Sequence, residues 1–163
     1  MKAIRTHEVG GPETLTLDEI DVPTPGKGEV LVAVKACAIN YPDTLMIRDL
    51  YQFKPERPYS PGGELAGIVE AVGEGVDNYK VGDRVMAGMG NGGLREKAIV
   101  PANRMFHVPD GVPFEKAASL LMTYGTTIHG LKDRGHITEG DVVLILGAAG
   151  GVGLSAIELA KAY

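Results

Sequence analysis

The sequence predicts a β-rich domain of short strands followed by the beginning of an α/β domain. Up to about residue 110, apolar and other residues alternate within short segments, as in half-buried strands. The 23 glycines and 10 prolines indicate many turns between those segments. Beyond residue 113 the apolar spacing becomes helical, and a nearly continuous apolar run then leads into a glycine-rich loop.

The strand predictions follow the chain in order. Strands are expected near the N-terminus and at 29–37, 64–72 and 94–100, and residues 81–87 are expected to form a turn that leads into a short strand. Within 29–37 the apolar side chains recur at every second position, which is the period of a strand with one buried face. Strands that are short and closely spaced favour a small barrel or sandwich.

The second part of the chain has a different pattern. Residues 113–131 have helical apolar spacing, with Gly125 as the point that divides them into two helices. Residues 141–146 (DVVLIL) are almost wholly apolar, which is typical of a central parallel strand that is buried on both faces. A helix is predicted to begin at Leu154.

Composition excludes several classes of protein. The net charge is −5 and the Lys and Arg residues form no run, which argues against a general nucleic-acid or anionic-membrane binder. No apolar stretch is long enough to span a bilayer. Cys37 is the only cysteine, so an internal disulfide is impossible. These features together predict a cytoplasmic protein that has no membrane partner.

Glycines recur at every third position in the segment that follows the apolar run, at Gly147, Gly150 and Gly153. Glycine permits a tight strand-to-helix turn and lets a pyrophosphate approach the backbone. The following helix N-terminus supplies free N–H groups for phosphates. The pattern therefore favours nucleotide binding, and the alternative is a tight turn without a ligand. The residue that selects NAD or NADP follows about 20 residues later, beyond the end of the chain.

Six segments carry a family resemblance: MKAIRTHEVGGPETL, VKACAINYPDTLMIRDLY, PGGELAGIVEAVGEGV, VGDRV, AASLLMTYGTT and LGAAGGVG. In order and spacing they resemble the zinc-free quinone oxidoreductase branch of the medium-chain dehydrogenase/reductase superfamily, along essentially the whole chain. The resemblance implies a GroES-like barrel domain, placed at 1–112, which C-terminal segments return to complete. It also implies a Rossmann domain that binds NADPH, whose connecting helices and first β-α unit occupy 113–163. The active site is expected between the two domains.

The residues argue against the zinc site of related enzymes. In the zinc-dependent pattern G-[IV]-C-x-x-D, Asn40 occupies the cysteine position and Asp43 matches the aspartate. In the pattern G-H-E, Gly63 replaces the histidine. Catalytic zinc in these enzymes uses cysteine or histidine ligands, and asparagine and glycine at two of those positions supply none, so no metal is predicted. Cys37 is interpreted as a small buried strand residue, and the four histidines have no paired metal spacing.

The resemblance places Asn40, Asp43 and Tyr51 at the catalytic site. The Asn40 amide could orient the nicotinamide or donate to a carbonyl oxygen. Tyr51 could donate a proton or a hydrogen bond, or only line the pocket. Asp43 is expected to support local structure more than to transfer protons. The implied reaction is hydride transfer to a quinone or an α,β-unsaturated carbonyl compound.

The resemblance also assigns residues to the cofactor. Thr126 is expected to contact the nicotinamide amide or ribose, with Thr127 as the alternative and Tyr124 as a possible core residue. The loop residues expected at the pyrophosphate are Gly147, Ala149, Gly150, Gly151, Val152 and Gly153.

The chain is expected to be the N-terminal portion of a larger enzyme, because a doubly wound sheet needs several parallel strands and only 141–146 is present. An unpaired apolar strand attracts other strands, so we expect a homo-oligomer or a complementary fragment. Two alternatives remain open. One is an enoyl or acryloyl thioester reductase of the same superfamily, and the other is a noncatalytic scaffold or interaction module.

Overall fold

The computed structural model describes residues 1–162, which form two compact units. The first unit comprises Met1–Ser119, and the second begins at Leu120. Each unit has its own internal contacts and is described by itself.

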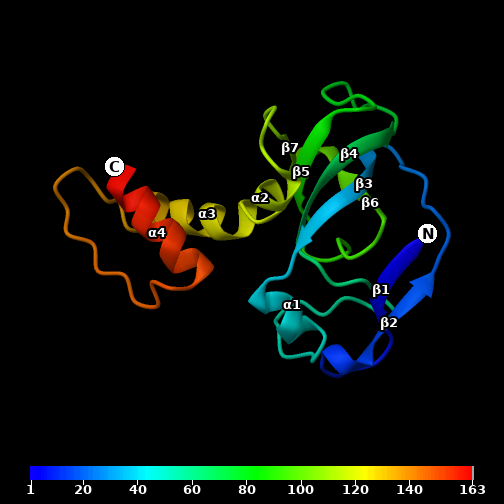
Figure 1. Cartoon of the computed structure of the whole chain (residues 1–163), viewed down its shortest axis with the longest axis horizontal. Helices are drawn as coiled ribbons and strands as arrows, with labels where there is room; N and C mark the ends of the chain where they lie inside the picture. The colour runs from blue at the N-terminus through cyan, green and yellow to red at the C-terminus, as the bar shows by residue number, and fades with distance from the viewer. Residues whose placement is uncertain (163) are drawn as a thin grey trace. The chain divides into compact units, whose positions relative to one another are not determined.

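The first unit contains two antiparallel sheets (Figure 1). β1 (Lys2–Thr6) and β2 (Leu15–Glu19) form a hairpin that includes the 3-10 turn η1 (Pro12–Thr14). The larger sheet has the strand order β6-β3-β4-β5-β7. Its strands are β3 (Glu29–Ala38), β4 (Glu64–Val72), β5 (Arg84–Gly88), β6 (Lys97–Pro101) and β7 (Met105–His107), with the 3-10 turn η2 (Ala102–Arg104) between β6 and β7.

Alternating side chains explain the core of this sheet. The Val30 and Val32 side chains are completely buried, as are those of Leu65, Val85 and Val100 on neighbouring strands. The predicted mainly β domain is confirmed, and the predicted strand at 64–72 coincides with β4. The predicted turn into a short strand at 81–87 agrees with β5, and β6 begins three residues later than predicted, while β2 and β7 were not predicted.

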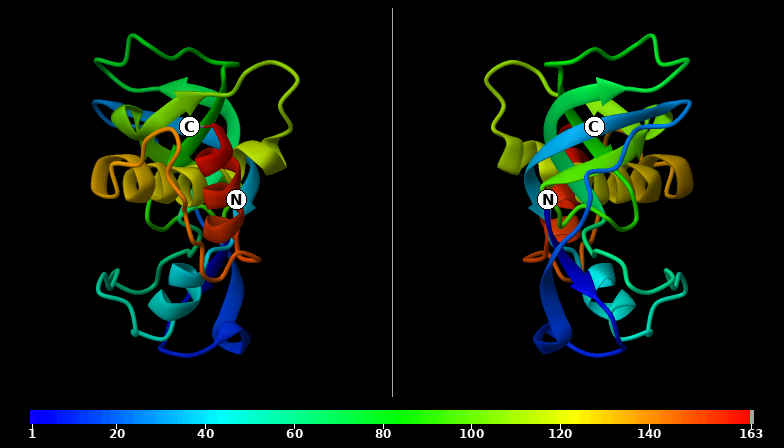
Figure 2. Two further views of the ribbon diagram at one scale, coloured as in Figure 1. Left: turned by 90° about the vertical axis from the view of Figure 1, so that its left-hand side faces the viewer. Right: turned by 90° about the vertical axis from the view of Figure 1, so that its right-hand side faces the viewer.

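Two short helices complete the first unit. α1 (Tyr41–Met46) lies beside the β1–β2 hairpin in both views of Figure 2, and the backbone N–H of Gly10 donates to the carbonyl oxygen of Ile47 at 3.1 Å. α2 (Phe114–Ala118) packs Ala117 and Ala118 against Ala66 of β4. The helix therefore contacts the sheet although it follows the predicted domain boundary at residue 112, which stays a prediction.

The second unit is helical. It contains α3 (Leu121–Ile128), the π-helical segment η3 (His129–Arg134) and α4 (Gly151–Ala162). The prediction that Gly125 divides two helices is wrong, because Gly125 lies inside α3 and the break falls at residues 119–120. A glycine inside a helix costs only about 1 kcal/mol relative to alanine, which packing between α3 and α4 can offset.

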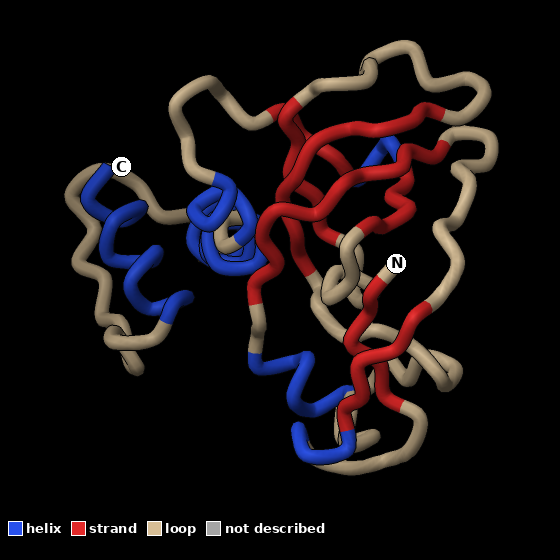
Figure 3. Tube along the Cα trace, turned by 45° about the vertical axis from the view of Figure 1, so that its right-hand side comes forward, coloured by secondary structure: helices blue, strands red, loops and turns tan. Residues whose placement is uncertain are grey.

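The predicted strand at 141–146 is wrong for this chain. These residues form no strand, and Figure 3 draws them as loop between the helices. Val142, Leu144 and Leu146 are 99%, 85% and 86% exposed. A strand needs a neighbour to pair its backbone groups, and no strand among the described residues of the second unit offers one.

Candidate functional site

The first candidate residues lie where β3 ends and α1 begins. Asn40 is the N-cap of α1 and has extended backbone angles. The backbone N–H of Asn40 donates to Asp43 Oδ2 at 2.8 Å, and the backbone N–H of Asp43 donates to the Asn40 carbonyl oxygen at 3.0 Å. An acidic residue at the third helical position commonly returns to the N-cap in this way. The sequence Asn-x-x-Asp therefore fixes the start of the helix.

Asp43 joins α1 to the beginning of β4. Its side chain is buried, and its Oδ1 accepts the backbone N–H of Gly62 at 2.9 Å. Burial raises the pKa of the Asp43 carboxyl, while the backbone N–H groups of Asn40, Gly62 and Gly63 act in the opposite direction. Both carboxyl oxygens are engaged by backbone groups, which favours a structural role over proton transfer.

Asn40 is oriented by a residue that the sequence reasoning missed. The Asn40 Nδ2 group donates to Glu64 Oε1 at 3.0 Å, and Glu64 is only 1% exposed. A carboxylate at the start of a mainly apolar strand, directly after Gly62-Gly63, was the signal that could have identified it. The contact fixes the direction of the Asn40 amide, because the carboxylate can only accept.

Tyr51 is not brought into this hydrogen-bonded group. It lies half-buried in the loop after α1, and among residues 1–162 no hydrogen bond joins it to Asn40 or Asp43. A cavity of about 230 Å³ with apolar walls borders Asp43 on the side of Ile39 and Ile47. The structure thus unites Asn40, Asp43 and Glu64, and it leaves Tyr51 on a separate segment.

Two glycines, Gly62 and Gly93, leave space for the Cys37 side chain. Gly62 has a φ of +97°, and a Cβ atom there would lie 2.5 Å from Cys37 Sγ, so a larger residue does not fit. Burial raises the pKa of the Cys37 thiol to about 12, so it stays protonated near neutral pH.

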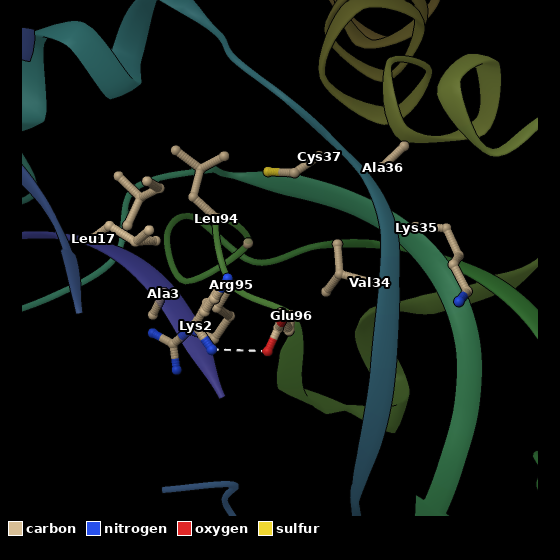
Figure 4. Close-up of a pocket in the computed structure, with 12 residues that line it drawn as sticks. Lys2, Ala3, Leu17, Val34, Lys35, Ala36, Cys37, Leu94, Arg95 and Glu96 are labelled. Atoms are coloured by element: carbon tan, nitrogen blue, oxygen red, sulfur yellow. Dashed lines mark hydrogen bonds between the residues drawn. The ribbon is translucent and has the colours of Figure 1, made fainter. Parts of the chain in front are cut away.

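Cys37 and Leu94 line a cavity of about 380 Å³ (Figure 4). The described residues contain no cluster of three His, Cys, Asp or Glu arranged to hold a metal ion.

The glycine-rich loop of the second unit forms a compact turn. Gly147 has a φ of +69°, and the N–H of Gly150 donates to the Gly147 carbonyl oxygen at 3.1 Å. A Cβ atom at Gly153 would lie 2.3 Å from that same oxygen, so only glycine permits this turn. α4 begins at Gly151, and its first N–H groups therefore have no acceptor within the helix. Residues 149–152 are exposed. This geometry fits a phosphate group at the backbone.

The two candidate threonines have different surroundings. The Thr127 side chain is buried, and its Oγ1 lies 2.6 Å from Ser155 Oγ of α4. Thr126 is exposed and free of that contact. Tyr124 is half-buried, and its hydroxyl donates to Glu158. Thr127 thus joins α3 to α4, and the assignment of either threonine to a cofactor stays a prediction.

Comparisons with known proteins agree with this arrangement. The family model described as the alcohol dehydrogenase GroES-like domain matches residues 26–110. A quinone oxidoreductase from Lama guanicoe is 40% identical over 99% of this chain and 50% of its own length. The structure of Escherichia coli quinone oxidoreductase complexed with NADPH has a TM-score of 0.93 at 36% identity, covering 99% of this chain and 50% of that one. An enoyl reductase structure has a TM-score of 0.91 at 29% identity, covering 99% and 51%.

The chain spans about half the length of the curated relatives it matches. No helix within residues 1–162 combines the length and the apolar character that crossing a membrane requires. The matches cover the β-rich unit and the residues that follow it. The chain belongs to the alcohol dehydrogenase GroES-like domain family, in the quinone oxidoreductase branch of the medium-chain dehydrogenase/reductase superfamily.

Proposed function

We propose that this chain is the N-terminal portion of an NADPH-dependent reductase that reduces quinones or α,β-unsaturated carbonyl compounds. The observation that carries the proposal is the Asn40 amide, which the buried Glu64 carboxylate holds in one orientation at the start of α1. Relatives of this branch include quinone oxidoreductases, one of them solved in complex with NADPH.

Asn40 is proposed to hold the reacting groups. With one Nδ2 hydrogen directed to Glu64, the amide would offer its second N–H to a nicotinamide or to a substrate carbonyl. A donor fixed before the reaction stabilises developing charge on a carbonyl oxygen without reorganisation. Asp43 keeps α1 in place, and Tyr51 contributes a hydrogen bond or a wall of the pocket.

The cofactor is proposed to be NADPH, with its pyrophosphate at the glycine-rich loop. The exposed residues Ala149, Gly150, Gly151 and Val152 would offer backbone N–H groups, and the glycines at 147 and 153 keep the turn tight. Thr126 would contact the nicotinamide end. When bound, NADPH supplies the hydride, and the protein supplies orientation and exclusion of water.

The apolar cavity beside Asp43 supports a substrate with an apolar body. Its walls include Ile39, Ile47 and Leu94, which suit a ring or alkyl group better than a charged one. The exposed apolar run at 142–146 further supports association with a second copy or a complementary fragment.

A second candidate is reduction of an enoyl or acryloyl thioester. The similarity to a solved enoyl reductase at 29% identity favours keeping it. The same Asn40 geometry would serve, since hydride addition to the β-carbon of a thioester-conjugated alkene also develops negative charge on the carbonyl oxygen, until a proton is added at the α-carbon.

The first experiment is a fluorescence titration of the purified chain with NADPH, with NADH in parallel. The test variant is Gly150→Ala, because a Cβ atom there would lie 3.5 Å from Gly147 O and fit the protein, yet it would project beside the expected phosphate. We expect about tenfold weaker binding, the effect of losing close backbone contact. Gly130→Ala is the matched control, since a Cβ atom there meets nothing within 4 Å.

Assays of the full-length protein with quinones, enones and an enoyl thioester then separate the substrate classes. Asn40→Ala should lower kcat/KM by about 100-fold with every productive substrate, as expected when a fixed donor to the reacting oxygen is lost. A full-length protein that binds neither nucleotide and reduces none of these compounds would contradict the proposal and would favour the scaffold alternative.

A further inference from the structure

The loop after α1 presents apolar side chains to solvent. It comprises residues 50–56, and Leu50 and Phe53 are 70% and 52% exposed, with the candidate residue Tyr51 between them. Large apolar side chains gathered on a loop at a candidate site are typical of a surface that contacts a ligand.

One ion pair closes the base of this loop. The Arg57 Nη2 group donates to Asp49 Oδ1 at 2.7 Å and to the carbonyl oxygen of Ile47 at 3.1 Å. The two side chains are 18% and 32% exposed, so both are largely shielded from water. The guanidinium also holds the pKa of the Asp49 carboxyl below its usual range. Residue 57 is thereby tied to the end of α1, across the loop.

Backbone contacts fix the chain on both sides of the pair. On one side, the N–H of Asp49 donates to the Met46 carbonyl oxygen at 3.1 Å. On the other, the N–H of Thr6 in β1 donates to the Tyr59 carbonyl oxygen at 2.8 Å. Among the described residues, none of residues 51–56 forms a hydrogen bond or ion pair with the rest of the protein. Within the described part of the chain, the hydrogen bonds that hold the loop therefore lie at its base.

We propose that the Asp49–Arg57 ion pair is a clasp that sets the position of residues 50–56, and that Arg57 is a positioning residue for the substrate. The second half of this proposal rests on the reductase function proposed above. Arg57 itself acts through Tyr51 and Phe53, whose side chains it keeps at a fixed place relative to α1.

The physical reason is conformational entropy. A seven-residue loop without internal hydrogen bonds samples many conformations once its ends separate. A substrate that needs Tyr51 and Phe53 together would then have to select one of those conformations, which weakens its apparent affinity. The reacting atoms are not touched, so KM should rise while kcat stays nearly constant.

Limited chymotrypsin digestion of the chain tests the clasp without any assay of activity. Leu50, Tyr51 and Phe53 are cleavage sites, and mass spectrometry identifies the fragments that end there. Arg57→Ala should be cut at these sites about fivefold faster, the effect expected for a partly exposed ion pair of good geometry. Arg57→Lys should recover part of the protection, because it can still pair with Asp49. Arg48→Ala is the matched control, since exposed Arg48 donates only to the Thr44 carbonyl oxygen.

A double-mutant cycle tests whether Asp49 and Arg57 protect the loop from chymotrypsin as a pair. Asp49→Asn keeps a side chain that tolerates the φ of 55° found at this position. If the two residues act as a pair, Asp49→Asn combined with Arg57→Ala should be cut no faster than Arg57→Ala alone. Thermal unfolding of each variant shows whether the first unit remains folded. If Arg57→Ala does not fold, the digestion of Asp49→Asn and Arg57→Lys replaces it as the test of the clasp.

Kinetics of the full-length protein test the positioning role. The expected result is a KM about fivefold higher in Arg57→Ala with kcat within about twofold of the wild type. Equal cleavage of Arg57→Ala and wild type overturns the clasp. Faster cleavage with an unchanged KM overturns the positioning role. A wild-type enzyme that reduces no substrate contradicts the proposed function instead, and the digestion result then still decides the clasp.

Discussion

Two apolar segments of this chain have opposite structures. Residues 29–38 form β3, which pairs with β4 on one side and β6 on the other, and its Val30 and Val32 side chains are completely buried. Residues 141–146 are at least as apolar, but they form no strand and their Leu144 side chain is 85% exposed.

The difference shows that apolar content alone does not make a strand. A strand pairs about half of its backbone groups with the neighbour on each side, and unpaired groups cannot be buried without a large cost. In the first unit β4 and β6 supply those partners to β3. In the second unit the described residues supply only helices. Burial of residues 141–146 therefore depends on strands from elsewhere.

The largest effect is expected from a comparison of two leucine substitutions, one in the buried sheet of the first unit and one in residues 141–146. Leu65→Ala removes a side chain that is 0% exposed in β4, so it should lower the free energy of unfolding by about 3 kcal/mol through lost burial and an internal cavity. Leu144→Ala should change it by less than about 0.5 kcal/mol, because the side chain is exposed. Urea unfolding of both variants gives the two values. Equal losses would mean that residues 141–146 are buried in solution, most simply by a second copy.

A smaller effect is expected at the contact between α3 and α4. Thr127→Val preserves shape but leaves the buried Ser155 hydroxyl without its 2.6 Å partner, which should cost about 1–2 kcal/mol. Thr126→Val, one residue away and exposed, should have almost no effect on stability. Loss of helical circular dichroism on heating measures both. If the two variants melted alike, the second unit would not depend on this contact.

The smallest effect is expected in the pH dependence of the free energy of unfolding, through the buried Asp43 carboxyl of the first unit. Because burial raises the pKa of Asp43, the folded chain keeps this proton at a pH where the unfolded carboxyl, with a pKa of about 3.9, has lost it. The contribution of Asp43 to the free energy of unfolding is therefore greatest below that pH. It decreases as the pH rises to the folded pKa, and it is constant above. Carbon NMR titration of the carboxyl, with Asp43→Asn to remove its share of the pH slope, checks this. A midpoint below the ordinary range of aspartate would refute it.

The sequence by itself determined the β-rich domain and its main strands. Alternation in 29–37 was sufficient, because a period of two is the period of a strand and of no helix, and this segment finds neighbours within the chain. It also identified Asn40 and Asp43, which do lie together at the start of α1. The glycine spacing predicted the turn into α4, since each steric requirement is local to the loop.

Tertiary structure decided the rest. Glu64 became the partner of Asn40 only because β4 begins beside α1, at a sequence separation that no local pattern spans. The different surroundings of Thr126 and Thr127 depended on which face of α3 meets α4. The Asp49–Arg57 pair required the loop between them to close. The fate of residues 141–146 depended on the presence of partner strands, because strand formation is a property of pairs of segments and not of one segment alone.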